Sequence, residues 1–168
     1  MKKILIPFLL IAFLFCGCQK KTTPTEMAGA KKSISEMLDR SFQAFMDKKL
    51  DSISVLLADS GLFCGTDPGE LWNKKAICDE YAKVFADTSI KSQMPKPDKR
   101  EILVQKDGKS AIVIEQLKGL SFCPNVPLRW VYYVVKEKEG WKINFSSIAL
   151  IPYNKDLPMI NKAVEQQK

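Results

Sequence analysis

The sequence predicts an α+β domain in which helices cover one face of a curved antiparallel sheet. Segments with helical periodicity precede residue 90, and from residue 100 onward the pattern changes to long β-rich runs. Tight turns at Asp107-Gly108 and at Gly140 separate these runs, so consecutive strands are expected to be antiparallel. Helices followed by a run of strands are typical of the α+β class.

Three helices and a short strand are expected before the sheet. Ser33, with Glu36 three residues later, matches a capping box at the start of the first helix. Asp51 is a suitable N-cap for the second helix. The helices are expected over residues 33–49, 51–59 and 73–87, the short strand over 62–65, and a closing helix over 154–166.

Four long strands are expected over residues 100–106, 109–122 and 127–151. Within the third strand the residues do not alternate between apolar and polar. Trp130 and Tyr132 point to one face, while Val131 and Tyr133 point to the other. Because one solvated face is usual for an antiparallel sheet, two apolar faces predict cover on both sides. We expect helices on the inner face and a homodimer contact on the outer face.

The N-terminus resembles a bacterial lipoprotein signal. Lys2 and Lys3 precede twelve apolar residues, which are too few to span a bilayer, since this needs about 20. Gly17 precedes Cys18, as in signals whose cysteine is lipidated, whereas Cys16 follows the large Phe15. The alternative is an ordinary secretory signal with two incidental cysteines.

These features divide the chain into a signal peptide (1–17), a lipidated flexible tether (18–32) and one domain (33–168). The tether is expected to be flexible because it is polar and interrupted by Pro24. Lipidation would anchor the protein without spanning the membrane. The expected location is therefore the extracytoplasmic side of the bacterial cell envelope, with the leaflet left open.

Charge and composition argue against several classes of partner. The net charge is +7, but four of these charges are lysines within residues 1–21, so residues 22–168 carry +3. The remaining lysines are scattered among acids and form no basic stripe, so we expect no nucleic-acid binding.

The sequence contains no histidine, which excludes His-based acid–base catalysis and most zinc and haem sites. Beyond residue 18 the cysteines are Cys64, Cys78 and Cys123, whose spacing matches no zinc motif. They allow at most one disulfide and are expected to be free and buried, as small apolar residues. No metal and no cofactor is predicted.

The order of motifs resembles the nuclear transport factor 2-like superfamily. The matching stretches are "LLADSGLFCGTDPGELWNKKAICDEYAKVF", the "DGKSAIV" hairpin and "GWKINFSS". SnoaL-like and ketosteroid-isomerase-like bacterial proteins are the most similar members. The resemblance implies a cone, with three helices packed into a strongly curved sheet, a pocket at the open end and dimerisation through the sheet. It does not imply one activity, because the superfamily contains both enzymes and binding modules.

The resemblance offers Asp67 as a catalytic base, and the residues themselves offer another interpretation. Asp67 could be a general base whose pKa is raised by apolar neighbours such as Phe63 and Trp72. Alternatively, Asp67, Pro68 and Glu70 match the N-cap, N1 and N3 positions of a helix. The capping interpretation is favoured because all these residues suit a helix start.

A second acid, Glu115, lies in the middle of an apolar strand. We favour an outward orientation, since charged side chains are seldom buried unpaired. If Glu115 points inward, Arg129 is the expected ion-pair partner. Tyr81, Tyr132 and Tyr133 are available as hydrogen-bond donors, so the enzymatic alternative uses Asp67, Glu115 and Tyr133.

In the last strand, related proteins often carry histidines after the tryptophan, whereas here the corresponding residues are apolar or a serine. The expected pocket is apolar, and we predict a non-catalytic module that binds a small apolar or aromatic ligand, an assembly partner, or both. The alternative is a carboxylate-based isomerase or dehydratase. The pocket-lining candidates are Phe63, Trp72, Tyr81, Arg129, Trp141, Ile143, Phe145 and Ser147.

Overall fold

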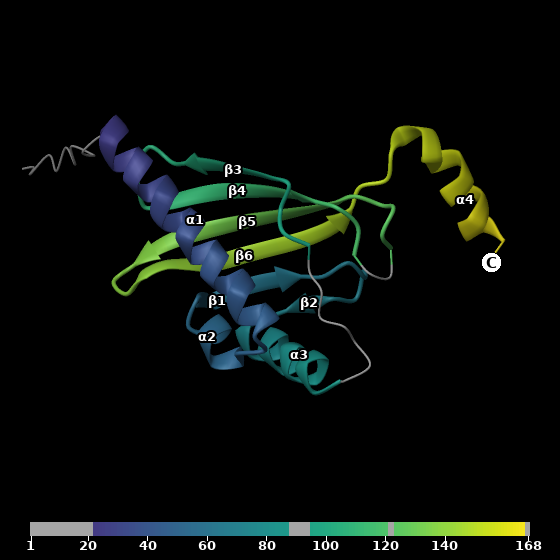
Figure 1. Cartoon of the computed structure of the whole chain (residues 1–168), viewed down its shortest axis with the longest axis horizontal. Coiled ribbons are helices and arrows are strands. Elements are labelled where there is room, and N and C mark those ends of the chain that lie inside the picture. Colours follow the sequence, from purple (N-terminus) through teal and green to yellow (C-terminus); the bar gives the residue numbers. More distant parts are fainter. Residues whose placement is uncertain (1–21, 88–94, 121–122, 167–168) are drawn as a thin grey trace, which may run out of the picture.

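The computed structural model describes residues 22–87, 95–120 and 123–166. It contains a six-stranded sheet, and α1 (Pro24–Met46) lies across one face of it (Figure 1). The short α2 (Leu50–Ser54) and α3 (Lys74–Ala86) pack near the C-terminal end of α1, next to β1 (Figure 1). The predicted signal peptide and Cys18 lie outside the described residues.

The sheet has the strand order β2-β1-β6-β5-β4-β3. Five of its strands are long or medium: β1 (Leu57–Cys64), β3 (Lys99–Val104), β4 (Ser110–Leu117), β5 (Leu128–Glu137) and β6 (Gly140–Leu150). The sixth, β2 (Leu71–Trp72), pairs with β1 at the edge. All neighbours are antiparallel except β1 and β6. The predicted α+β class and four-strand meander are confirmed.

The first helix begins earlier than predicted. The Thr23 side chain accepts a hydrogen bond from the N–H of Glu26, and the Glu26 side chain accepts one from the N–H of Thr23. The capping box is therefore here and not at Ser33. Pro24 occupies the first turn, where proline is favoured. The predicted flexible tether is therefore wrong for residues 24–32, because Pro24 starts a helix and does not interrupt the chain.

The second helix is shorter than predicted and the strand after it is longer. Residues 57–59, expected at the end of a helix, form the start of β1, which pairs in parallel with β6. This pairing joins residues more than 80 positions apart, so no local pattern could indicate it. Leu57 and Ala58 are buried by it.

A β-bulge in β6 controls which side chains face the helices. Tyr133 pairs with Phe145, whereas the next residue, Val134, pairs with Ile143, so Asn144 is the additional residue. A bulge shifts the alternation of side chains by one position. Ile143 and Ser146 are consequently both buried on the inner face.

The last helix, α4 (Leu157–Glu165), follows the short turn η1 (Asn154–Asp156) and stands away from the end of the sheet (Figure 1). All its residues are exposed. The predicted closing helix exists, but because its residues are all exposed it does not close the domain. In the part of the chain that the structure describes, α4 included, no helix combines the length and apolarity needed to cross a membrane.

Candidate functional site

A pocket lies between α1 and the inner face of the sheet. Its empty space is about 620 Å³, a figure that includes the open mouth, so the enclosed part is smaller. Apolar and aromatic side chains supply most of its wall, and the only charged ones are Arg100 and Glu115. Its lining residues are Leu38, Ser41, Phe42, Phe45, Ile53, Leu57, Phe63, Tyr81, Pro97, Arg100, Glu115, Leu117, Trp130, Tyr132, Ile143 and Ser146.

Glu115 points into this pocket and is only 3% exposed. It lies directly opposite Arg100 on the neighbouring strand, and cross-strand partners are close enough for their side chains to interact. The Nε of Arg100 donates to Oε1 of Glu115 over 2.6 Å. The favoured outward orientation is therefore wrong: pairing with Arg100 allows the carboxylate to be buried.

The other oxygen of Glu115 is occupied by Tyr132. The phenol O–H donates to Oε2 over 3.0 Å, from a position diagonal to Glu115 on the next strand. Burial, with the adjacent negative charge of Glu115, raises the pKa of Tyr132 well above its usual value. Tyr132 therefore remains a protonated donor at neutral pH.

Arg100 also binds α1, and so connects the sheet to the helix. Its Nη1 donates to the hydroxyl of Ser35 over 2.7 Å and to Asp39 over 2.9 Å. Burial lowers the pKa of Arg100, but the charges and hydrogen bonds of Glu115 and Asp39 outweigh this and raise it. The cluster thus contains one cation and two carboxylates.

Aromatic rings form the rest of the pocket. Phe45 meets Tyr81 edge to face with ring centres 5.4 Å apart, while Trp130 stacks on Tyr132 at 5.2 Å. Burial raises the pKa of Tyr81 to about 12. Among the described residues, the indole Nε1 of Trp130 is the one buried side-chain nitrogen or oxygen without a hydrogen-bond partner.

Only three of the eight predicted pocket residues line the pocket: Phe63, Tyr81 and Ile143. Trp72 and Trp141 belong to the adjoining hydrophobic core. Arg129, the predicted partner of Glu115, is exposed on the opposite face of the sheet and was wrongly chosen. The actual partner, Arg100, lies opposite Glu115 on β3, which becomes apparent only from the register of β3 with β4.

Phe145 and Ser147 do not line the pocket because of the bulge. Counting by twos from Trp141 gives Ile143, Phe145 and Ser147, but the additional residue Asn144 moves the inner position to Ser146. Ser146 pairs with Tyr132 and lines the pocket. The prediction failed because a bulge leaves no clear signal in the sequence.

Tyr133 is also outside the pocket. It is 38% exposed on the outer face, so it cannot serve the enzymatic alternative, whereas Tyr132 contacts Glu115. The sequence alternation had placed these two tyrosines on opposite faces, and this is confirmed.

Asp67 is neither a pocket base nor a helix cap. It is exposed in the turn between β1 and β2. Its Oδ1 accepts the N–H of Gly69 over 2.9 Å, and Glu70 accepts the N–H of Asp67 over 2.9 Å. The hydrogen bonds of a capping box are thus present without a helix, since α3 starts later with Asn73 as its N-cap.

The structure offers no evident metal ligands or disulfide. Across residues 22–87, 95–120 and 123–166, no three His, Cys, Asp or Glu side chains gather in a way that could hold a metal ion. Cys64, Cys78 and Cys123 are free, as expected, but they are only partly buried.

Known structures share this architecture. An NTF2-like protein from Cytophaga hutchinsonii is 18% identical, with a TM-score of 0.57 over 72% of this chain and 98% of that one. A cystatin-like domain of unknown function from Nostoc punctiforme is 15% identical, with a TM-score of 0.62 over 80% and 85%. A proposed dehydratase of the NTF2-like family from Streptomyces avermitilis is 14% identical, with a TM-score of 0.58 over 73% and 96%. At these identities the likeness establishes the fold alone.

The model of the SnoaL-like domain matches residues 34–153, which is most of the chain. Among curated proteins, none matches the sequence. The chain belongs to the SnoaL-like domain family, and it has the α+β fold of the NTF2-like structures described above.

Proposed function

We propose that the protein is a membrane-anchored, non-catalytic module that binds a small apolar or aromatic molecule between α1 and the sheet. The observation that carries the proposal is that both oxygens of Glu115 are hydrogen-bonded within the protein. One oxygen accepts from Arg100 and the other from Tyr132, in a pocket that is otherwise mainly apolar. A general base must be within reach of a substrate proton, and the protein already holds both oxygens of this acid.

The test is binding of small aromatic molecules, followed by tryptophan fluorescence and by the melting temperature. Ser41 lines the pocket, so Ser41→Trp should fill it and abolish binding. Gln43 is an exposed residue on the same helix, so Gln43→Trp is the matched control and should bind as the wild type does. Equal binding by both variants would contradict the proposed site.

The alternative function is a carboxylate-based isomerase or dehydratase, and the pairing of Glu115 with Tyr132 inside the pocket favours it. The similarity in fold to the proposed Streptomyces dehydratase is compatible with this alternative. Turnover of an unsaturated ketone or a hydroxy ketone that disappears in Glu115→Gln, while binding persists, would establish it and overturn the non-catalytic proposal.

A homodimer through the outer face of the sheet is part of the proposal. One row of apolar residues crosses five strands on that face: Leu103, Ile112, Tyr133, Phe145 and Leu62, each paired with the next. Four of the five are at least 38% exposed. A contiguous apolar surface of this kind marks an interface, and two-fold symmetry would allow each row to cover its counterpart.

Light scattering at tens of micromolar should give a dimer for the wild type and a monomer for Tyr133→Lys. Tyr153 is exposed outside this row, so Tyr153→Lys is the matched control and should remain dimeric. A monomeric wild type would contradict the proposed interface.

Anchoring through lipidated Cys18 completes the proposal and rests on the sequence signal alone. Cys18→Ser should release the protein from the membrane fraction, whereas Cys16→Ser should not. Wild-type protein that is soluble and unlipidated would refute it.

A further inference from the structure

We infer that the pocket selects uncharged aromatic molecules and rejects carboxylates of the same size. The inference rests on the proposed ligand-binding function and names its ligand class. It follows from the way the one cation in the pocket, Arg100, is already neutralised.

A buried arginine is the usual means of binding an anionic ligand, because its guanidinium matches a carboxylate. Here two of the three guanidinium nitrogens are already bonded to the protein. Its Nε bonds to Glu115 at 2.6 Å and its Nη1 bonds to Asp39 at 2.9 Å. Only 16% of the Arg100 side chain is exposed. An incoming carboxylate could reach only Nη2 without displacing one of these partners, and it would then lie beside the two carboxylates that already neutralise the guanidinium.

The charge of the cluster also opposes an anion. Two carboxylates and one guanidinium leave a net charge of −1 beside the pocket. In addition, an anion entering the pocket loses its hydration, and burying an unpaired charge is strongly unfavourable.

A cationic ligand gains little from the acid in the pocket lining, because Arg100 already balances its charge. Glu115 is the only acid among the residues that line the pocket, and both its oxygens are bonded. Asp39 has a side chain that is 66% exposed. The aromatic rings and the two serines, Ser41 and Ser146, suit a neutral ring system with a small polar group.

Three probes of nearly equal size test the inference with the full-length protein: 2-naphthylmethanol, 2-naphthoate and 2-naphthylmethylammonium. Titrations at pH 7, followed by calorimetry, should give the tightest binding for the alcohol and at least about tenfold weaker binding for the carboxylate. If the carboxylate binds as tightly as the alcohol, the inference is wrong while the binding function stands. If no probe binds, the proposed function fails and the inference fails with it.

Two variants should reverse the selectivity. Glu115→Gln frees Arg100 from its buried partner, so the affinity for naphthoate relative to the alcohol should rise by about tenfold or more. Asp39→Asn, at an exposed site that the fold tolerates, should raise the same ratio by about two- to fivefold. If Glu115→Gln does not fold, Asp39→Asn decides the question.

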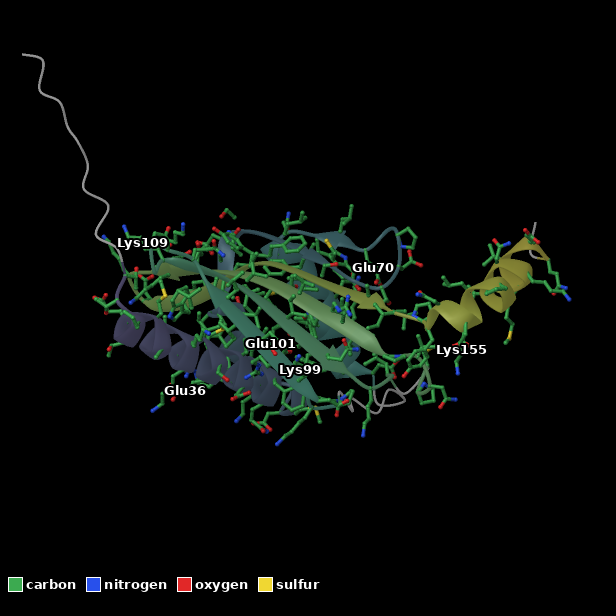
Figure 2. All side chains as sticks on the ribbon, turned by 90° about the horizontal axis from the view of Figure 1, so that it is seen from above. Glu36, Glu70, Lys99, Glu101, Lys109 and Lys155 are labelled. Carbon is green, nitrogen blue, oxygen red and sulfur yellow. The ribbon has the colours of Figure 1, made fainter. Side chains whose placement is uncertain are left out.

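Glu36→Gln is the control for net charge. Glu36 is an exposed acid on the side of α1 that points away from the sheet (Figure 2). Glu36→Gln changes the net charge by the same amount as Asp39→Asn, but Glu36 does not contact Arg100. The affinity for naphthoate relative to the alcohol should therefore be unchanged. The inference would be overturned if the affinity ratio rose equally in Glu36→Gln and Asp39→Asn. It would also be overturned if the ratio rose in neither Glu115→Gln nor Asp39→Asn.

Discussion

The two faces of the sheet handle polar and apolar groups in opposite ways. The inner face buries a carboxylate, Glu115, whereas the outer face exposes an apolar row that includes Ile112 and Tyr133. On the inner face each oxygen of the buried acid has a partner from the protein. On the outer face the apolar side chains have no cover within the described chain. The inner face is therefore complete in one copy, while the outer face is suited to a partner.

The charged pairs on the two faces show the same contrast. Arg100 and Glu115 form an inner pair in which both side chains are at most 16% exposed. Lys99 and Glu101, on the neighbouring positions of β3, form an outer pair in which both are more than 60% exposed (Figure 2). The chemistry of the pairs is similar, so the difference in burial decides their effects on stability.

The largest effect is expected from removing the acid of the inner pair. Glu115→Ala leaves Arg100 without its buried partner, and such changes reduce the free energy of unfolding by about 3–5 kcal/mol. The lower end is expected because Ser35 and Asp39 still bind Arg100. Glu101→Ala, in the outer pair, should change it by less than about 1 kcal/mol. Similar losses in the two variants, measured by urea unfolding, would remove the contrast between the faces.

Alkaline pH should destabilise the inner face through its tyrosines. The pKa of Tyr81 is about 12 in the folded protein, against about 10 in an unfolded chain. Its contribution is fully present below about pH 10 and is lost as the pH rises towards 12, because only the unfolded state releases the proton in that range. The urea midpoint of Tyr81→Phe should fall less over this range than that of the wild type.

Tyr153 is the exposed control for this pH dependence. Its replacement by Phe should leave the alkaline slope of the wild type unchanged. If Tyr81→Phe retains that slope while Tyr153→Phe reduces it, the assignment to the buried phenol is wrong.

The smallest effect is expected at Asp67, which lies outside both faces. Asp67→Ala loses the hydrogen bond from Gly69 and should lower stability by about 0.5–1 kcal/mol, whereas Asp67→Asn keeps an acceptor and should be nearly neutral. Aromatic ligands should bind both variants as tightly as they bind the wild type. Thermal melting separates the variants, and a raised midpoint for Asp67→Asn would indicate an unfavourable charge at this position.

The elements that depend on local patterns could be predicted from the sequence. The meander followed from its turns: Gly108 adopts φ +66°, the left-handed conformation that makes glycine suitable there. The opposite orientation of Tyr132 and Tyr133 followed from the alternation of a strand. The start of α1 had a local signal in Thr23, Pro24 and Glu26, but proline there was interpreted as an interruption.

The candidate site depends on contacts that local patterns do not contain. Ser35 is 65 positions from Arg100 in the sequence, so their contact arises only when α1 lies on the sheet. The partner of Glu115 depends on the register of β3 with β4. The bulge at Asn144 depends on two strands accommodating different numbers of residues. Sequence patterns therefore identified the acid and the aromatic residues, and not their arrangement.

The early start of α1 would restrict how the domain sits at a membrane. Thr22 donates to the carbonyl of Lys106 over 2.9 Å, which fixes the start of the helix beside the β3–β4 turn. A lipid on Cys18 would be separated from Thr22 by at most about 14 Å of extended chain, which is a short tether.

The pocket residues Pro97, Leu117 and Trp130 lie at the opposite ends of these strands from that turn. With so short a tether, the turn would rest near the lipid headgroups, and these pocket residues would lie at the end of the sheet farther from the bilayer. A lipidated form of this protein would therefore present its ligand site to the aqueous compartment and not to the lipid.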